Sequence, residues 1–135
     1  MTDSSDRNTG FCPRGDRNNI ELFTSCLTFT PHSPQECMCP QQKYERSKEG
    51  KTQKYAPPMS EFDMLATSLK AGEKETLDKA GGPGILLITK GSGQMKANGK
   101  EVKLHEGACY FVAHGVELQF EAGSEGLLSH LAFVE

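Results

Sequence analysis

The sequence has no long hydrophobic run. None of its 135 residues lies in a stretch that approaches the roughly 18 to 20 apolar residues of a membrane span. Apolar residues make up 36% of the chain and the mean hydropathy is −0.54, both low for a compact domain. The polar start Met1–Asn8 predicts no signal peptide. These absences exclude membrane-embedded functions.

The sequence also has no excess of positive charge. Its 15 Lys and Arg residues are outnumbered by 18 Asp and Glu residues, which gives a net charge of −3. Proteins that bind nucleic acid or anionic membrane surfaces normally carry a concentrated basic patch, so we expect neither partner. The five Cys residues are odd in number and follow no disulfide framework. A reduced, cytoplasmic protein is the simplest interpretation.

The common catalytic motifs are absent. The chain has no Gly-x-Ser-x-Gly, P-loop or Rossmann glycine pattern, and Gly91-x-Gly93 is expected to be a turn between strands. His105, His114 and His130 fall on three different predicted strands or turns, which is too few converging ligands for a metal site. The pair Cys37-Met-Cys39 has one residue between its thiols rather than two, so we interpret both as free thiols.

The two parts of the chain differ in composition. Residues 1–60 hold four of the five Cys and six of the seven Pro, whereas residues 61–135 hold 11 of the 14 Gly. The first part carries eight basic and seven acidic residues, and the second carries seven basic and 11 acidic residues. We therefore predict an N-terminal arm over residues 1–54 and a separate folded domain over residues 55–135.

The predicted arm contains one short amphipathic helix. Asp16 is a plausible N-cap, and Ile20, Phe23 and Leu27 recur at helical spacing, which predicts a helix over about residues 17–27. Prolines at 31 and 34 end it, and five Pro between residues 30 and 58 indicate extended connecting chain. The most polar run, residues 41–54, is expected to be a mobile loop.

The second part is predicted to be a small antiparallel barrel. Short apolar or alternating runs separated by Gly-rich turns give about eight strands, with no room for crossover helices. Asn98-Gly99 is the strongest turn signal, because a type I′ hairpin needs positive φ at both positions. A jelly roll accommodates this strand number best. The expected strands are residues 62–69, 73–77, 85–89, 94–97, 100–104, 108–113, 117–121 and 127–134.

One segment has the outline of a conserved cupin motif. In Glu106–Gly115 a Gly precedes an aromatic and apolar strand, which a small residue, a polar residue and Gly then close, with Ala113 where Pro is usual. The other cupin motif supplies a His-x-His pair and a Glu to a metal, and it should lie around residues 91–103. That stretch contains no His. The sequence therefore resembles a mainly β, cupin-like jelly-roll barrel without its usual metal ligands.

Several motifs, which follow one another along the chain, point to a more specific resemblance. They are Asn8-Thr9-Gly10-Phe11-Cys12-Pro13-Arg14, the helix from Glu21 to Phe29, Tyr55-Ala56-Pro57-Pro58-Met59-Ser60-Glu61-Phe62, and the glycine-rich elements of the barrel. Together they resemble the C-terminal, cupin part of class I zinc-dependent mannose-6-phosphate isomerases, as found in filamentous fungi. The resemblance implies a role in the interconversion of mannose 6-phosphate and fructose 6-phosphate, which feeds GDP-mannose synthesis.

The resemblance also implies what this chain lacks. The family's zinc ligands are a Gln, two His and a Glu, all upstream of the segment that matches, so no zinc is expected to bind here through them. Arg14 matches a basic position that faces the sugar phosphate, and it is the candidate substrate contact. We expect this truncated chain to be inactive alone and to self-associate or pack on a full-length isomerase through Ile20, Phe23 and Leu27. The alternative is a stand-alone small cupin that acts as a binding or interaction module.

Overall fold

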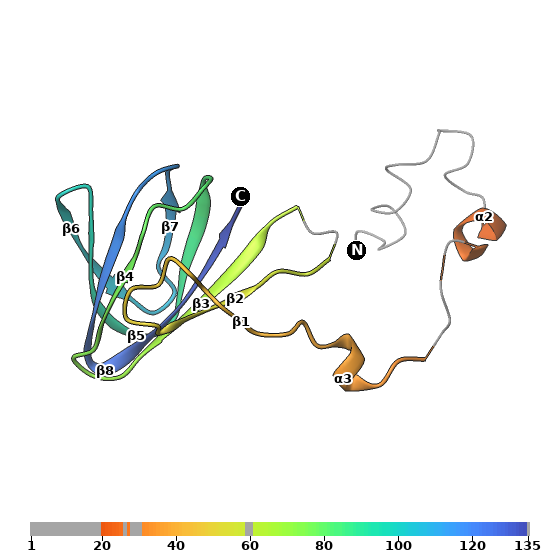
Figure 1. The fold of residues 1–135 in the computed structure, drawn as a ribbon, viewed down its shortest axis with the longest axis horizontal. Coiled ribbons are helices and arrows are strands. Elements are labelled where there is room, and N and C mark those ends of the chain that lie inside the picture. The colour runs from red at the N-terminus through yellow and green to blue at the C-terminus, as the bar shows by residue number, and fades with distance from the viewer. Residues whose placement is uncertain (1–19, 26, 28–30, 59–60, 135) are drawn as a thin grey trace. The chain divides into compact units, whose positions relative to one another are not determined.

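The computed structural model describes residues 20–25, 27, 31–58 and 61–134, apart from the side chains of Leu22 and Phe23. The chain divides into two compact units, Met1–Cys37 and Met38–Glu135. The second unit holds all the strands found in the described residues and is shown at the left of Figure 1. No helix in the described ranges is long and apolar enough to cross a membrane.

Two short helices lie in the described part of the first unit. Helix α2 spans Ile20–Ser25, inside the range predicted from the apolar spacing. The hydroxyl of Thr24 donates to the carbonyl of Ile20 at 2.9 Å. Two of the three residues proposed as an apolar stripe can be assessed: Ile20 is 75% exposed and Leu27 is 39% exposed.

Helix α3, Pro34–Cys37, was not predicted, because residues 30–58 were expected to be extended. Its N-terminus is a capping box: the Ser33 amide donates to Glu36 Oε2 at 2.7 Å, and the Glu36 amide donates back to Ser33 Oγ at 3.3 Å. Pro34 occupies the first helical position, where its missing N–H costs nothing. The hydrogen bonds from Ser33, the backbone one first, hold the pKa of Glu36 below its usual value.

The second unit is a jelly roll built on one continuous antiparallel ladder. The strands run in the order β1-β2-β3-β8-β5-β6, while β4 also pairs with β8 and β7 also pairs with β5. The fold class expected from the sequence is confirmed. The strands are β1 Gln42–Lys43, β2 Thr52–Tyr55, β3 Asp63–Leu69, β4 Lys74–Leu77, β5 Gly84–Ala97, β6 Lys100–His105, β7 Cys109–Val112 and β8 Leu118–Phe133.

Two long strands are shared by both walls of the barrel. The first half of β5 pairs with the second half of β8, between β7 and β3. The second half of β5 pairs with the first half of β8, between β6 and β4. Because these strands turn from one wall into the other, six strands after residue 61 take the place of the eight that were predicted (Figure 1).

The glycines in the middle of these strands make bulges rather than turns. The expectation of a turn at Gly91-x-Gly93 was wrong: β5 runs through it, with register shifts on either side of Gly91. Gly91 has a φ of +81°, which a bulged strand position can require and which favours glycine. By contrast, the Asn98-Gly99 hairpin is confirmed, with φ of 50° and 74° at its two turn residues.

The segment expected as a mobile loop contributes to the sheet. Strands β1 and β2 lie within residues 41–55, and β2 pairs with β3 from Thr52↔Thr67 to Tyr55↔Met64. The units therefore divide at Cys37/Met38, whereas the sequence placed the boundary at about residue 54. Residues 41–54 are mostly polar because few of their side chains enter the core. Their backbone nevertheless adds strands β1 and β2 to the edge of the sheet.

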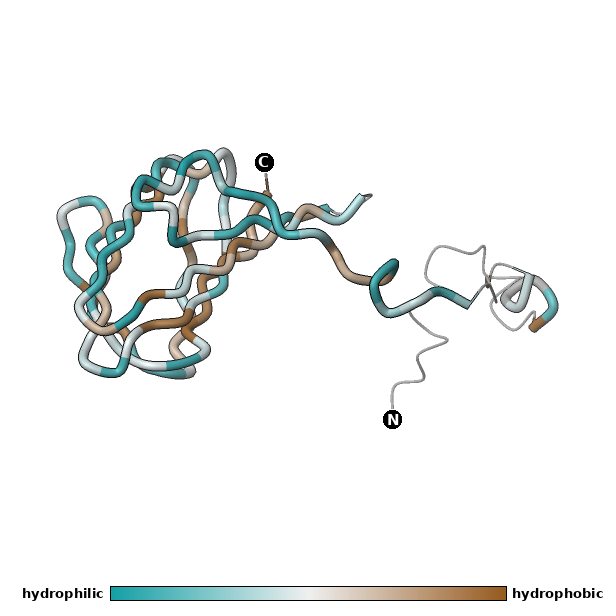
Figure 2. Tube along the Cα trace, turned by 60° about the horizontal axis from the view of Figure 1, so that its bottom comes forward, coloured by the Kyte–Doolittle hydropathy of each residue, from teal (hydrophilic) through white to brown (hydrophobic). Residues whose placement is uncertain are grey.

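The interior of the barrel is mostly apolar. Figure 2 shows hydrophobic stretches on its strands and hydrophilic stretches in the loops that join them. The alternating pattern of the strands sends every second side chain inward. The largest fully buried side chains are those of Phe120, Phe133, Leu65, Leu86 and Ile88.

Candidate functional site

Arg14, the residue singled out as a sugar-phosphate contact, lies outside the described residues. Its role therefore stays a prediction. The same is true of the Phe23 side chain in the proposed apolar stripe. In the barrel, the features that could form a site are the histidines, the buried polar groups and the hollows of the surface.

The histidines of the barrel are dispersed. His105 and His114 are exposed. His130 is half-buried on the outward side of β8, where its Nδ1 lies 3.2 Å from the hydroxyl of Thr89. Within residues 20–25, 31–58 and 61–134, no group of three or more His, Cys, Asp or Glu side chains could hold a metal ion.

The barrel wall buries one carboxylate completely. Glu75 on β4 has an exposure of 0%. Its Oε2 accepts hydrogen bonds from the Ser47 hydroxyl at 2.9 Å and the Lys51 amide at 2.6 Å, and its Oε1 accepts from the Glu49 amide at 3.2 Å. Several donors that converge on a buried carboxyl group offset the cost of removing it from water.

This arrangement ties residues 47–51 to β4 and is structural rather than catalytic. The donors around Glu75 come from the chain itself, so the carboxylate oxygens are already used. Glu75 was not singled out from the sequence, although a signal existed: in Lys74-Glu75-Thr76-Leu77 the alternation places Glu75 on the same side as Leu77, which is buried.

The wall formed by β4, β8, β5 and β6 carries polar side chains outward. Two shallow hollows lie on it, of about 270 Å³ and 510 Å³. In the first, Lys74 Nζ lies 3.1 Å from Glu121 Oε2 and Lys96 Nζ lies 3.0 Å from Glu101 Oε1. Because these lysines are paired with carboxylates, the first hollow has little net charge to attract a phosphate.

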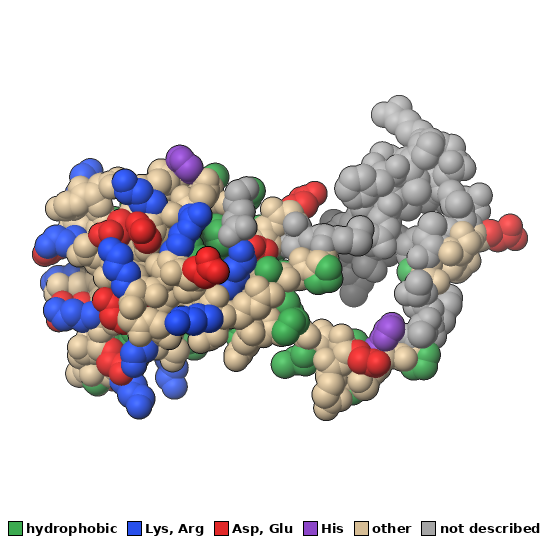
Figure 3. Space-filling view, viewed as in Figure 1, with side chains coloured by type: hydrophobic (Ala, Val, Ile, Leu, Met, Phe, Trp, Pro, Cys, Tyr) green, Lys and Arg blue, Asp and Glu red, His purple; other side chains and the backbone are tan. Residues whose placement is uncertain are grey.

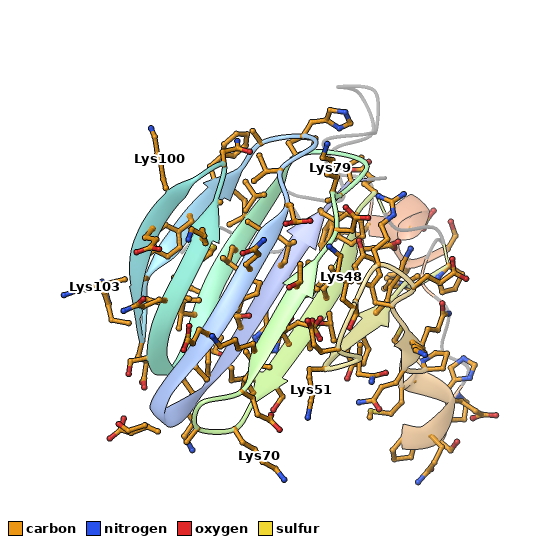
Figure 4. All side chains as sticks on the ribbon, turned by 60° about the vertical axis from the view of Figure 1, so that its left-hand side comes forward. Lys48, Lys51, Lys70, Lys79, Lys100 and Lys103 are labelled. Atoms are coloured by element: carbon orange, nitrogen blue, oxygen red, sulfur yellow. The ribbon has the colours of Figure 1, made fainter. Side chains whose placement is uncertain are left out.

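The second hollow includes Lys103. Figure 4 shows this lysine projecting outward from β6. Figure 3 shows acidic and basic side chains interspersed over the barrel face in view.

The fold is that of known cupin proteins. A cupin 2 conserved barrel domain protein from Salinispora arenicola superposes with a TM-score of 0.56 at 10% identity, over 81% of this chain and 90% of that one. A cupin protein from Bacteroides fragilis superposes with a TM-score of 0.51 at 19% identity, over 57% and 68%. At these identities the likeness shows the fold alone. No protein-family model matches the sequence.

The relatives found by sequence are more informative. The mannose-6-phosphate isomerase of Saccharomyces cerevisiae is 33% identical over 129 residues, which cover 93% of this chain and 29% of that enzyme. This chain is a homologue of the fungal mannose-6-phosphate isomerases. The Schizosaccharomyces pombe enzyme is 32% identical over 128 residues, covering 93% and 31%. That of Aspergillus fumigatus is 36% identical over 72 residues, covering 53% and 16%.

The resemblance seen in the sequence is therefore confirmed. The chain spans about three tenths of the length of the mannose-6-phosphate isomerases from the two yeasts. The enzymes of this family are generally zinc-dependent, so the donor set of the chain has to be tested against zinc. A zinc site needs three or four clustered N, S or O ligands. The described residues offer no such cluster and do not fit the metal.

Proposed function

We propose that this chain acts as the cupin part of a mannose-6-phosphate isomerase and does not itself perform the zinc-dependent chemistry. The observation that carries the proposal is the homology over 93% of this chain to only 29% of a mannose-6-phosphate isomerase. The residues it supplies build a barrel with a filled core. On this proposal it works in the cytoplasm, beside the parts of the enzyme that hold the metal and the sugar phosphate.

Arg14 is the residue we propose for substrate contact. A guanidinium group can donate two parallel hydrogen bonds to a phosphate, which suits a sugar phosphate ligand. The proposal rests on the match of Gly10-Phe11-Cys12-Pro13-Arg14 to the family motif. We also propose that Ile20, Phe23 and Leu27 pack against the rest of an isomerase or a second chain, which is supported by the exposure of Ile20 and Leu27.

An isomerase assay tests the catalytic half of the proposal. The purified 135-residue chain, supplied with zinc and mannose 6-phosphate, is expected to form no fructose 6-phosphate. Measurable turnover that disappears on chelation would contradict it.

A chimera tests whether the chain serves as the cupin part of an isomerase and whether Arg14 contacts the substrate. In it this chain replaces the homologous segment of the S. cerevisiae enzyme, and Arg14→Ala is compared with Arg17→Ala. Retained activity that Arg14→Ala reduces more strongly supports the assignment.

A second candidate is an independent binding module. It is favoured by the barrel's self-contained core within the unit Met38–Glu135 and by the two polar hollows on its surface. Thermal shift with mannose 6-phosphate, fructose 6-phosphate and unphosphorylated mannose distinguishes the two. Stabilisation by unphosphorylated mannose as strongly as by the phosphates, in the chain alone, would favour this candidate.

A further inference from the structure

A residue with a hydroxyl group is followed directly by proline at two places in the chain. They are Thr30-Pro31 and Ser33-Pro34. Thr30 lies outside the described residues, whereas Ser33 and Pro34 are described. Ser33 stands directly before helix α3, near the end of the first unit at Cys37. Neither the barrel nor the proposed isomerase role accounts for this motif.

Proline after a serine is the feature that proline-directed protein kinases recognise. These kinases offer no hydrogen-bond acceptor to an N–H group at the position after the phosphorylated residue, and proline has no N–H. Proline also restricts the residue before it to extended backbone, which is the form in which a kinase binds its substrate segment. Ser33 lies outside the helix that begins at Pro34. Its local backbone therefore suits such a kinase.

The segment around Ser33 is accessible. Every residue from Pro31 to Met38 is exposed, and the side chain of Glu36 is 65% exposed. Helix α3 has only four residues, none of them buried, and its N-terminus is held by its own capping box. Segments with few buried contacts open locally at low cost in free energy. A kinase can therefore bind this segment in extended form without disrupting a packed core.

The buried hydroxyl groups of the barrel provide the contrast. Thr52 is 0% exposed, Ser129 is 1% exposed and Thr67 is 2% exposed. The hydroxyl oxygens of Thr52 and Thr67 lie 2.8 Å apart in a hydrogen bond. Each of the three residues belongs to a strand and none is followed by Pro. A kinase would have to pull a strand out of the ladder to reach them.

A phosphate on Ser33 would conflict with Glu36. In the capping box the Ser33 hydroxyl donates to Glu36 Oε2 at 3.0 Å, and the Ser33 amide donates to the same oxygen at 2.7 Å. Phosphorylation removes the proton that Oγ donates and adds about −1.5 to −2 charge at pH 7. The contact between the Ser33 side chain and the Glu36 carboxylate then changes from a hydrogen bond into a repulsion between like charges.

We propose that Ser33 is a phosphorylation site for a proline-directed protein kinase, and that its phosphorylation opens the capping box of α3. ATP, bound by the kinase, is the phosphoryl donor. Ser33 Oγ forms a bond to the γ-phosphorus, the bond from that phosphorus to the β,γ-bridging oxygen breaks, and ADP leaves. The hydroxyl proton passes to a base of the kinase. The inference does not depend on the proposed isomerase role.

A phosphorylation assay on the full 135-residue chain tests the site. The chain is incubated with ATP and either a purified mitogen-activated protein kinase or a purified cyclin-dependent kinase, and peptide mass spectrometry locates the phosphate. We expect phosphate on Ser33, and its loss in Ser33→Ala and in Pro34→Ala, because alanine restores the N–H group. The matched control is Ser124→Ala, at an exposed serine that is not followed by Pro, which should leave the phosphorylation of Ser33 unchanged.

The opening of the capping box has its own measurement. The Ser33 amide, and then its hydroxyl, hold the pKa of Glu36 below its ordinary value. Phosphorylation should therefore raise this pKa, because it removes the bond from the hydroxyl and adds negative charge beside the carboxylate. An NMR titration of Glu36 measures the rise. Ser33→Ala, which removes the hydroxyl without adding charge, should raise the pKa less.

Two results would overturn the proposal. If neither kinase phosphorylates Ser33 in the chain, the site is refuted. A synthetic peptide of residues 28–38 then shows whether the sequence or the fold prevents the reaction. An unchanged pKa of Glu36 in the phosphorylated chain refutes the opening of the capping box, because a phosphate beside an intact box would have to alter it.

Discussion

A side chain at Gly91 would overlap the carbonyl oxygen of Gly126. The Cβ of any other residue there would meet the Gly126 backbone, and Gly91 also has a φ of +81°. The two glycines lie where β5 and β8 turn from one wall of the barrel into the other. Their close approach is what allows two strands to serve both walls.

Gly91→Ala should therefore destabilise the barrel by about 2–4 kcal/mol, through positive-φ strain and backbone overlap together. Gly107→Ala is the matched control, because Gly107 has the same φ of +81° and a Cβ there would have no neighbour within 4 Å. It should cost only about 1 kcal/mol. Urea unfolding measures both. Equal losses would show that strain alone, and not the approach to Gly126, constrains position 91.

Glu75→Gln should lower the free energy of unfolding by about 2–3 kcal/mol. The amide keeps the shape, but at either oxygen position its NH₂ group would face a backbone N–H donor, that of Lys51 or that of Glu49. Glu121→Gln removes an exposed partner of Lys74 and should cost at most about 1 kcal/mol. Thermal or urea unfolding of both variants provides the comparison. Similar small losses would contradict a stabilising role for the buried carboxylate.

The stability of the barrel should decrease in acid partly through Glu73. The hydrogen bond from the Lys51 side chain, and then that from the Lys70 amide, hold the pKa of Glu73 below its ordinary value of 4.5. A carboxyl whose pKa is lowered by folding stabilises the fold above its unfolded pKa and loses that contribution as pH falls through its folded pKa.

The urea midpoint of the wild type should therefore fall as pH decreases below about 4.5. Glu73→Gln should show a smaller fall, while Lys51→Met should show an intermediate one because the Lys70 amide remains. Other carboxyls keep some pH dependence in the variants, among them Glu117, whose pKa is lowered by hydrogen bonds from Gln119 and Lys48. Identical profiles for wild type and Glu73→Gln would rule out this contribution.

Zinc should leave the melting temperature of the chain unchanged. A metal that binds only the folded state raises the melting temperature by an amount that grows with its affinity, and the described residues offer no group of three ligands. Differential scanning fluorimetry with zinc, with magnesium as a control cation, measures this. A rise specific to zinc and reversed by a chelator would place a metal site on this chain.

The amino-acid sequence by itself determined the class of fold and the position of its clearest turn. Alternating strands, Gly turns and Asn98-Gly99 are local signals, so the mainly antiparallel barrel and the β5–β6 hairpin could be predicted and were confirmed. The resemblance to mannose-6-phosphate isomerases could likewise be recognised from ordered motifs, and the homologues from two yeasts confirm it. Arg14, as the candidate substrate contact, stays a prediction.

Other features depended on contacts between distant segments, which no local pattern contains. In the sequence Gly91 is typical of a turn, and only the contact with Gly126 shows that it lies in a bulged strand. Glu75 is likewise typical of a surface residue, and only the packing of residues 47–51 against it shows that it is buried. The capping box at Ser33 and Glu36 could have been found from its spacing. The row formed by Phe111, Ile85, Ala132 and Met64 on the outer side of the barrel could not, because these residues are far apart in sequence and only strand pairing brings them side by side.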